Sequence, residues 1–215
     1  MMEFIHESQR FLPLLLRGVG MTLEVSLGAL VLSTLLGVVL AMLRINRHAA
    51  VHQPARWLIS VTRGLPAMVQ VYYVYFVLPD YGIALTAFAA AVIGLGVANA
   101  GFQAENFRAG IEAVDQGQAE AADALGMTWR VKMQRVILPQ AIKVMLPTYG
   151  NSMVSVLKDS SLASTITVAE LSLQGKLLAA SSFENTTVFT LVALLYLCLC
   201  VPLMTLNRWL ERRAS

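Results

Sequence analysis

The sequence is short of charge: only 13% of its 215 residues are Asp, Glu, Lys or Arg, whereas 57% are hydrophobic. A soluble domain carries about 25% charged residues, so this chain has too little charge to cover a water-facing surface. The composition therefore indicates an integral membrane protein. Because each membrane-spanning helix takes roughly 20 residues, the length leaves no room for a separate soluble catalytic domain.

Cysteine is also scarce, since Cys198 and Cys200 are the only two and lie in an apolar run, where a disulfide framework is not expected. His48 and His52 are spaced for metal binding but lack a third ligand, so no metal site is predicted. No G-x-x-x-x-G-K-[ST] phosphate loop and no catalytic nucleophile with its base occurs. The net charge of +3 gives no sign of nucleic-acid binding. The chain is therefore predicted not to be an enzyme.

Five apolar stretches predict an all-α, multi-pass membrane domain that takes up residues 1–215. The predicted spans are residues 19–43, 57–78, 81–104, 137–157 and 185–207, with a polar connection at residues 105–136. Small residues recur every four positions in the first and third spans, which allows close helix packing. Basic residues gather in alternate connections and in the C-terminal tail, as they do on the cytoplasmic side. This pattern predicts an N-terminus outside and a C-terminus inside.

The polar connection after the third span is longer than a simple loop requires. Residues 118–125 are rich in Ala and Glu, which favour helix, and Gly126 can end that helix in the left-handed conformation. Thr128 can cap a second short helix that starts at Trp129. We therefore expect two helices joined at a glycine, in a shape suited to docking in a groove on a partner.

Several segments carry a resemblance to a known family. Glu120-Ala121-Ala122, with Gly126 and Leu138-Pro139 at the matching spacing, resembles the EAA signature of membrane subunits of bacterial ATP-binding-cassette (ABC) importers; Val136 stands where that signature usually has Ile. Residues 63–70, 105–111, 117–118, 158–162 and 170–171 are similar to polar amino-acid uptake permeases of the histidine, glutamine, arginine and opine branch. The resemblance covers about residues 20–208.

This resemblance implies a type I importer fold and a permease subunit of the bacterial inner membrane. The expected cargo is a polar amino acid or related compound, delivered by a periplasmic binding protein. The expected partners are ATPase subunits, which carry ATP and Mg, a second permease subunit, identical or paralogous, and membrane lipids. By this resemblance the coupling helix that seats in the ATPase contains Glu120, Ala121, Ala122 and Gly126.

Polar side chains inside the predicted spans, or at the outer end of the fourth one, are candidates for the substrate path, because polar groups are costly in a membrane and often functional there. These candidates are Glu24, Gln70, Asn99, Asn151, Ser155, Asp159 and Ser160. The Glu24 carboxylate could receive an ammonium group, or could lie at the outer interface beside an arginine. Residues 151, 155 and 159 share one helical face, and Pro147 in the same helix suggests a kink or a break.

Two other functions remain open from the sequence. One is an ATP-independent channel or ion-coupled carrier, which the few spans, the lack of an evident internal repeat and the long polar connection disfavour. The other is a scaffold permease subunit whose paired subunit holds the substrate. The sequence does not indicate which amino acid is carried, nor whether the two permease subunits are identical.

Overall fold

The computed structural model describes the backbone of residues 2–214 and the side chains of residues 7–212. The described chain is built from helices, which confirms the all-α prediction. The α-helices are α1 (Met2–Ile45), α2 (Ala49–Gly64), α3 (Ala67–Tyr72), α4 (Ala87–Glu112), α5 (Gln116–Ala124), α6 (Trp129–Lys132), α7 (Leu138–Asp159), α8 (Leu171–Ser182) and α9 (Asn185–Ala214). Short π and 3-10 segments follow α3 and α7 and precede α7.

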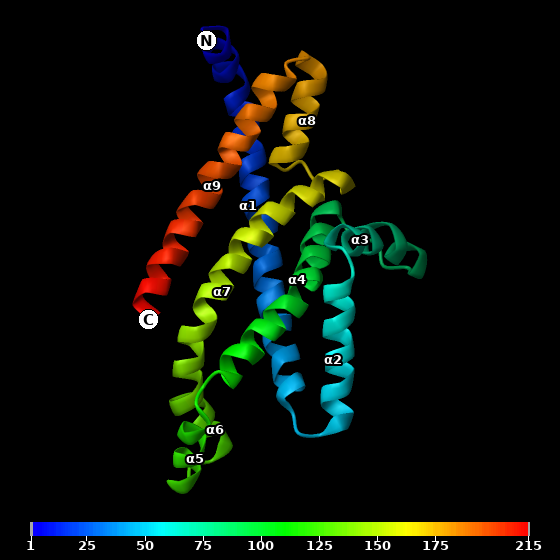
Figure 1. The fold of residues 1–215 in the computed structure, drawn as a ribbon. Coiled ribbons are helices and arrows are strands. Elements are labelled where there is room, and N and C mark those ends of the chain that lie inside the picture. Colours follow the sequence, from blue (N-terminus) through cyan, green and yellow to red (C-terminus); the bar gives the residue numbers. More distant parts are fainter. Residues whose placement is uncertain (1, 215) are drawn as a thin grey trace.

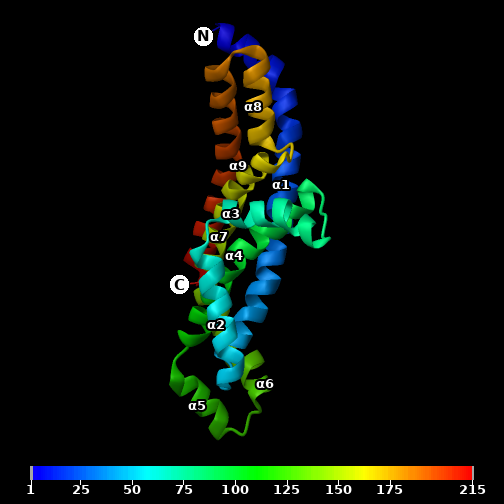
Figure 2. The ribbon, with the colours of Figure 1, turned by 90° about the vertical axis from the view of Figure 1, so that its right-hand side faces the viewer.

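The molecule is long and narrow, with α1 running along much of its length (Figure 1). The N-terminus and α8 lie at one end, and α5 and α6 lie at the opposite end (Figures 1 and 2). Helix α4 packs against α1, and α7 packs against both α4 and α9. The short helices thus project from one end of a long helical bundle.

Helices α1 and α4 run in the same direction and approach each other closely. Gly28 faces Val92, and a Cβ atom on Gly37 would lie 2.6 Å from the Cβ atom of Gln103. Ala29, a small residue beside this contact, is fully buried. Close backbone approach of this kind suits a membrane, where helix association depends on packing rather than on removal of apolar surface from water.

The second predicted span, residues 57–78, is not one continuous helix. Helix α2 ends at Gly64, and Leu65 takes an extended conformation with φ −95° and ψ 136°. The reason is Pro66, since proline disfavours the helical conformation of the residue before it. The Gln70 side chain donates from Nε2 to the carbonyl oxygens of Thr62 at 2.8 Å and Leu65 at 3.1 Å. It thereby stabilises a break that interrupts the expected helix.

Among the described residues, three helices are long and apolar enough to cross a membrane. They are Glu7–Ile45, Ala87–Glu112 and Asn185–Arg212. Helix α7 coincides closely with the fourth predicted span but does not meet these criteria, and the second span is broken as described. The count of five spans and the orientation of the chain therefore stay predictions.

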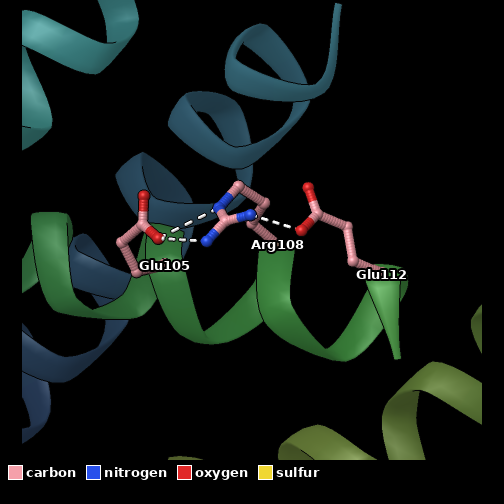
Figure 3. Close-up of polar contacts among 3 residues, drawn as sticks. All are labelled: Glu105, Arg108 and Glu112. Carbon is pink, nitrogen blue, oxygen red and sulfur yellow. Dashed lines mark hydrogen bonds and ion pairs between the residues drawn. The ribbon is translucent and has the colours of Figure 1, made fainter. Parts of the chain in front are cut away.

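The polar connection begins later than residue 105, because α4 continues to Glu112. The last turns of α4 contain an ion-pair cluster in which Arg108 lies between two acids (Figure 3). Its Nη2 atom lies 2.7 Å from Oε2 of Glu105, and its Nη1 atom pairs with Glu112. Spacings of three and four residues place these side chains on one helix face. The charges belong to the end of α4, and the connection starts at Ala113.

Candidate translocation site and coupling segment

A cavity of about 340 Å³ lies where the end of α2 meets α4 and the end of α7. We call it the α2–α4 cavity; its lining residues are Arg63, Gly64, Leu65, Pro66, Ala67, Ala98, Asn99, Phe102 and Asp159. Five of the nine, residues 63–67, lie in the break after α2 or directly beside it. The interruption of the predicted second span therefore shapes the cavity, because a continuous helix would place these residues on different faces.

The α2–α4 cavity contains charges of both signs. The guanidinium carbon of Arg63 lies 5.3 Å from the centre of the Phe102 ring, which is a cation–π distance. Asp159, at the end of α7, also lines the cavity and interacts with the Asn99 side chain. Asn99 also donates from Nδ2 to the Leu95 carbonyl oxygen at 2.9 Å. A cation, an amide and a carboxylate thus share one small space.

Tight packing behind the cavity brings α2 and α4 close together. A Cβ atom on Gly101 would meet the Thr62 hydroxyl group and would lie 3.0 Å from the Cγ atom of Arg63. Glycine at this position lets α2 lie directly on α4. Gln70, predicted as a path residue, is buried behind the break and does not line the cavity. Its place in the structure is to support the segment that carries Arg63.

The predicted path residues divide into those at the cavity and those elsewhere. Asn99 and Asp159 line it together. Ser160 is buried beside it and donates to the Leu157 carbonyl oxygen at 2.7 Å. Arg63 was not predicted as a site residue, although an arginine inside an apolar span is itself a signal of function.

Three predicted path residues lie away from the α2–α4 cavity. Glu24 is exposed on the surface of α1, and Ser155 is exposed on α7. Asn151 accepts a hydrogen bond from Asn207 of α9 at 3.1 Å. Helix α7 continues through Pro147 without a break. The expected polar stripe on α7 is therefore interrupted by its contact with α9 and reaches the cavity only at Asp159.

The predicted coupling segment is a short helix with a sharp reversal. Gly126 has φ +67°, and the amide groups of Gly126 and Met127 donate to the carbonyl oxygens of Asp123 at 3.0 Å and Ala122 at 3.1 Å. This pair of bonds is the Schellman ending of a helix, which favours glycine. Lys132 of α6 lies 2.6 Å from the Asp123 carboxylate and fastens the two helices. The expected pair of helices joined at a glycine is confirmed.

The coupling residues present different faces of α5. Glu120 and Ala121 are exposed, whereas Ala122 is buried against the rest of the chain. Thr128 stands at the N-cap of α6, as expected, but its side chain makes no capping hydrogen bond. The exposed part of α5 thus combines the Glu120 carboxylate, and the Asp123 carboxylate paired with Lys132, with small side chains, and another protein can approach such a surface closely.

A buried carboxylate braces the opposite end of the molecule. Glu170 caps α8, accepting from the amide groups of Ser172 and Leu173 at 2.8 Å each and from the Tyr196 hydroxyl group at 2.8 Å. Burial raises the pKa of Glu170, and the hydrogen bonds it accepts oppose that rise. The sequence marked this residue only through the family resemblance, because its partner on α9 is distant along the chain.

Comparison with known proteins shows what kind of molecule has this fold. Residues 33–215 match the family of inner-membrane components of binding-protein-dependent transport systems. The chain belongs to this family. A probable amino-acid ABC transporter permease, PatM of Vibrio harveyi, is 39% identical over 207 residues, covering 95% of this chain and 93% of that protein. The octopine transport system permease protein OccM of Rhizobium radiobacter is 36% identical, covering 91% and 84%.

Solved structures of this kind of transport component share the fold. A chain from an amino acid ABC transporter crystallised with histidines is 34% identical, with a TM-score of 0.90 and coverage of 96% of this chain and 97% of that one. A chain of the inward-facing MetNI methionine ABC transporter has a TM-score of 0.81 at 21% identity, covering 97% and 99%. This transport-system component therefore has the fold of ABC importer permeases, as predicted, and is a membrane subunit.

Proposed function

We propose that this chain is the permease subunit of an ATP-driven importer that moves an amino acid or a related zwitterion across the bacterial inner membrane. The relatives named above are amino-acid and octopine permeases, which supports this cargo class. The observation that carries the proposal is the α2–α4 cavity, in which Arg63 and Asp159 present opposite charges.

The cavity chemistry suits both ends of an amino acid. The Arg63 guanidinium can bind the α-carboxylate, and Asp159 can bind the ammonium group, both through charge-assisted hydrogen bonds. The Asn99 amide can assist with either end of the cargo, because it both donates and accepts hydrogen bonds. Leu65 and Phe102 supply apolar wall for the remaining atoms of the cargo. Charged residues within membrane spans commonly pair with one another and mark substrate pathways.

The exposed face of α5 is proposed as the contact with an ATPase subunit, in which ATP and Mg bind. Glu120 can pair with a basic residue there, and Gly126 permits the reversal that projects the helix. Two permease subunits, identical or paralogous, complete the path, and a periplasmic binding protein delivers the cargo. The proposed orientation has the N-terminus outside and the C-terminus inside.

The test uses the complete transporter in proteoliposomes with its binding protein. We expect Asp159→Asn and Arg63→Ala to lower amino-acid uptake at least tenfold, because each removes one charged contact of the zwitterion. Basal ATP hydrolysis and assembly should remain. Matched controls are Asp80→Asn and Arg56→Ala, which remove exposed charges outside the cavity and should leave uptake unchanged.

Two outcomes would overturn the proposal. Uptake by the permease without its ATPase would indicate a channel or an ion-coupled carrier. Normal uptake by both cavity variants would indicate that the paired subunit binds the cargo and that this chain is a scaffold. Glu24→Gln is measured in the same assay to test the remaining charged candidate of the path. In the described chain this exposed carboxylate does not line the α2–α4 cavity.

A further inference from the structure

An apolar groove lies between α1, α4 and α7. It has a volume of about 400 Å³, and its walls include Val38 and Met42 of α1, Phe107 and Ile111 of α4, and Ile142 and Leu146 of α7. The only hydroxyl groups in its lining, those of Thr34 and Tyr149, bond each other at 2.9 Å. The groove therefore offers no free polar side-chain group to a ligand, which suits a hydrocarbon chain.

A second, larger cavity lies at the C-terminal end of α1. This end cavity has a volume of about 990 Å³ and is formed by the turn between α1 and α2, the end of α4, and α5 and α6. Its polar lining includes Asn46, Arg47, His48 and Lys132. Trp129 stands exposed in its wall, and tryptophan is enriched where a membrane meets water.

The groove and the end cavity adjoin each other. Met42 of α1 and Ile111 of α4 belong to the lining of both. Along α1 the lining changes from apolar residues to Arg47 and His48 within two turns, as expected at the boundary of a hydrocarbon layer. A ligand that fills both parts needs an apolar chain at one end and a polar group at the other.

The charges of the end cavity favour an anion. Its one acid, Glu112, is paired with Arg108, and Lys132 is paired with Asp123. Within the described side chains, Arg47 and His48 make no ion pair and no side-chain hydrogen bond. The Arg47 guanidinium and the His48 imidazole are thus left to meet a negative headgroup.

We propose that the groove and the end cavity together bind a phospholipid with an anionic headgroup. The headgroup phosphate lies in the end cavity against Arg47 and His48, and an acyl chain lies in the groove between α1 and α7. Basic pockets at the ends of membrane helices recognise anionic lipids in this way. A peripheral protein could cover the end cavity but not the groove, because the groove walls from α1 and α7 lie within the predicted spans. The lipid site is distinct from the cargo site, since the α2–α4 cavity shares no lining residue with the groove or the end cavity.

The test is native mass spectrometry of the delipidated, complete transporter titrated with phosphatidylglycerol or phosphatidylcholine of the same chains. We expect phosphatidylglycerol to bind more tightly, and Arg47→Ala/His48→Ala to weaken it at least fivefold, since a basic residue near an anionic surface contributes about 1 kcal/mol, roughly fivefold. The matched control is His52→Ala/Arg56→Ala, which removes the same two side-chain types from α2 outside the end cavity. The control should bind as the native protein does.

A second variant tests the acyl-chain part. Ile142→Trp fills the groove and should weaken both lipids alike, whereas the headgroup variant should affect only phosphatidylglycerol. Equal binding by the headgroup variant, its control and the native transporter would overturn the proposal. A disulfide-linked pair of permeases formed by Ile142→Cys, in a Cys198→Ala/Cys200→Ala background, would show that a second copy covers the groove and would also overturn it. Lipid binding is measured without transport, so its failure is separate from failure of the proposed function.

Discussion

Asn207 of α9 donates from Nδ2 to the Oδ1 atom of Asn151 in α7 at 3.1 Å and lies 3.2 Å from the Pro147 carbonyl oxygen. Asn207 is only 5% exposed, whereas Asn151 is exposed. Gly150 leaves the space that the Asn207 side chain occupies, because a Cβ atom there would collide with it. The contact between α7 and α9 thus depends on one buried amide fitted against a glycine.

Asn207→Ala should therefore destabilise the protein more than Asn151→Ala. Loss of a buried hydrogen-bonding side chain costs about 1–3 kcal/mol, and about 2–4 °C of Tm per kcal/mol is expected for a chain of this size. Thermal unfolding of the purified transporter measures both variants. Gly150→Ala should lower Tm as well, and Asn207→Ala in the same chain should restore part of the loss. An equal effect of the two asparagine variants would contradict this account.

Glu170→Gln should alter the pH dependence of stability. Burial raises the pKa of Glu170 in the folded chain, so its contribution to stability is fully present below the ordinary glutamate pKa and declines as pH rises through the raised pKa. As the pH rises through this range, the native protein should lose stability relative to the glutamine variant. Tm measured at steps from acidic to neutral pH tests the difference, and parallel curves would refute it.

Gly94→Ala should lower Tm, because a Cβ atom at Gly94 would lie 2.7 Å from the Cα atom of Val71 in α3. The backbone of α3 would have to move away from α4. Gly20→Ala is the matched control: its Cβ atom would meet nothing within 4 Å, and alanine inside a helix is favoured by about 0.5–1 kcal/mol over glycine. We expect opposite signs for the two substitutions, and a shared sign would contradict the packing of α3 on α4.

Gly126→Val and Glu120→Lys should uncouple ATP hydrolysis from uptake. Valine is strained at φ +67°, and lysine reverses the charge on the exposed face of α5. The controls are Gly126→Asn and Gln134→Lys. Asparagine tolerates the left-handed conformation, and the second control places a lysine on a neighbouring exposed residue. The measurement is ATPase activity stimulated by the loaded binding protein. Unchanged stimulation in both test variants would exclude a coupling role for these residues.

Local signals were sufficient where the chain's own neighbours decide the structure. The start of α9 at Asn185 and the reversal at Gly126 follow from composition and from glycine geometry. The break at Leu65 was missed although Pro66 is visible, because a long apolar window conceals one residue's conformation. The hydrogen bonds of Gln70 to this break could therefore not be predicted from the sequence and are seen only in the structure.

The candidate site was predictable only in part. Asn99 and Asp159 stand out as polar residues at the predicted spans, but they lie 60 positions apart and nothing local brings them together. Arg63 joins them because Gly101 admits α2 against α4. Glu24 lies exposed on α1, and a carboxylate in an apolar stretch gives no indication of which side of its helix faces inward, so its place in the path stays a prediction.

The bracing of α8 by Glu170 has a mechanical consequence. Tyr196 of α9 bonds the Glu170 carboxylate, and the Leu171 amide group donates to the Thr22 hydroxyl of α1 at 3.1 Å. A connector that is fixed by buried polar bonds to helices on both sides transmits a displacement instead of absorbing it. At this end of the molecule α1, α8 and α9 are therefore joined into one unit, and we expect a displacement of α9 to be passed on to α1.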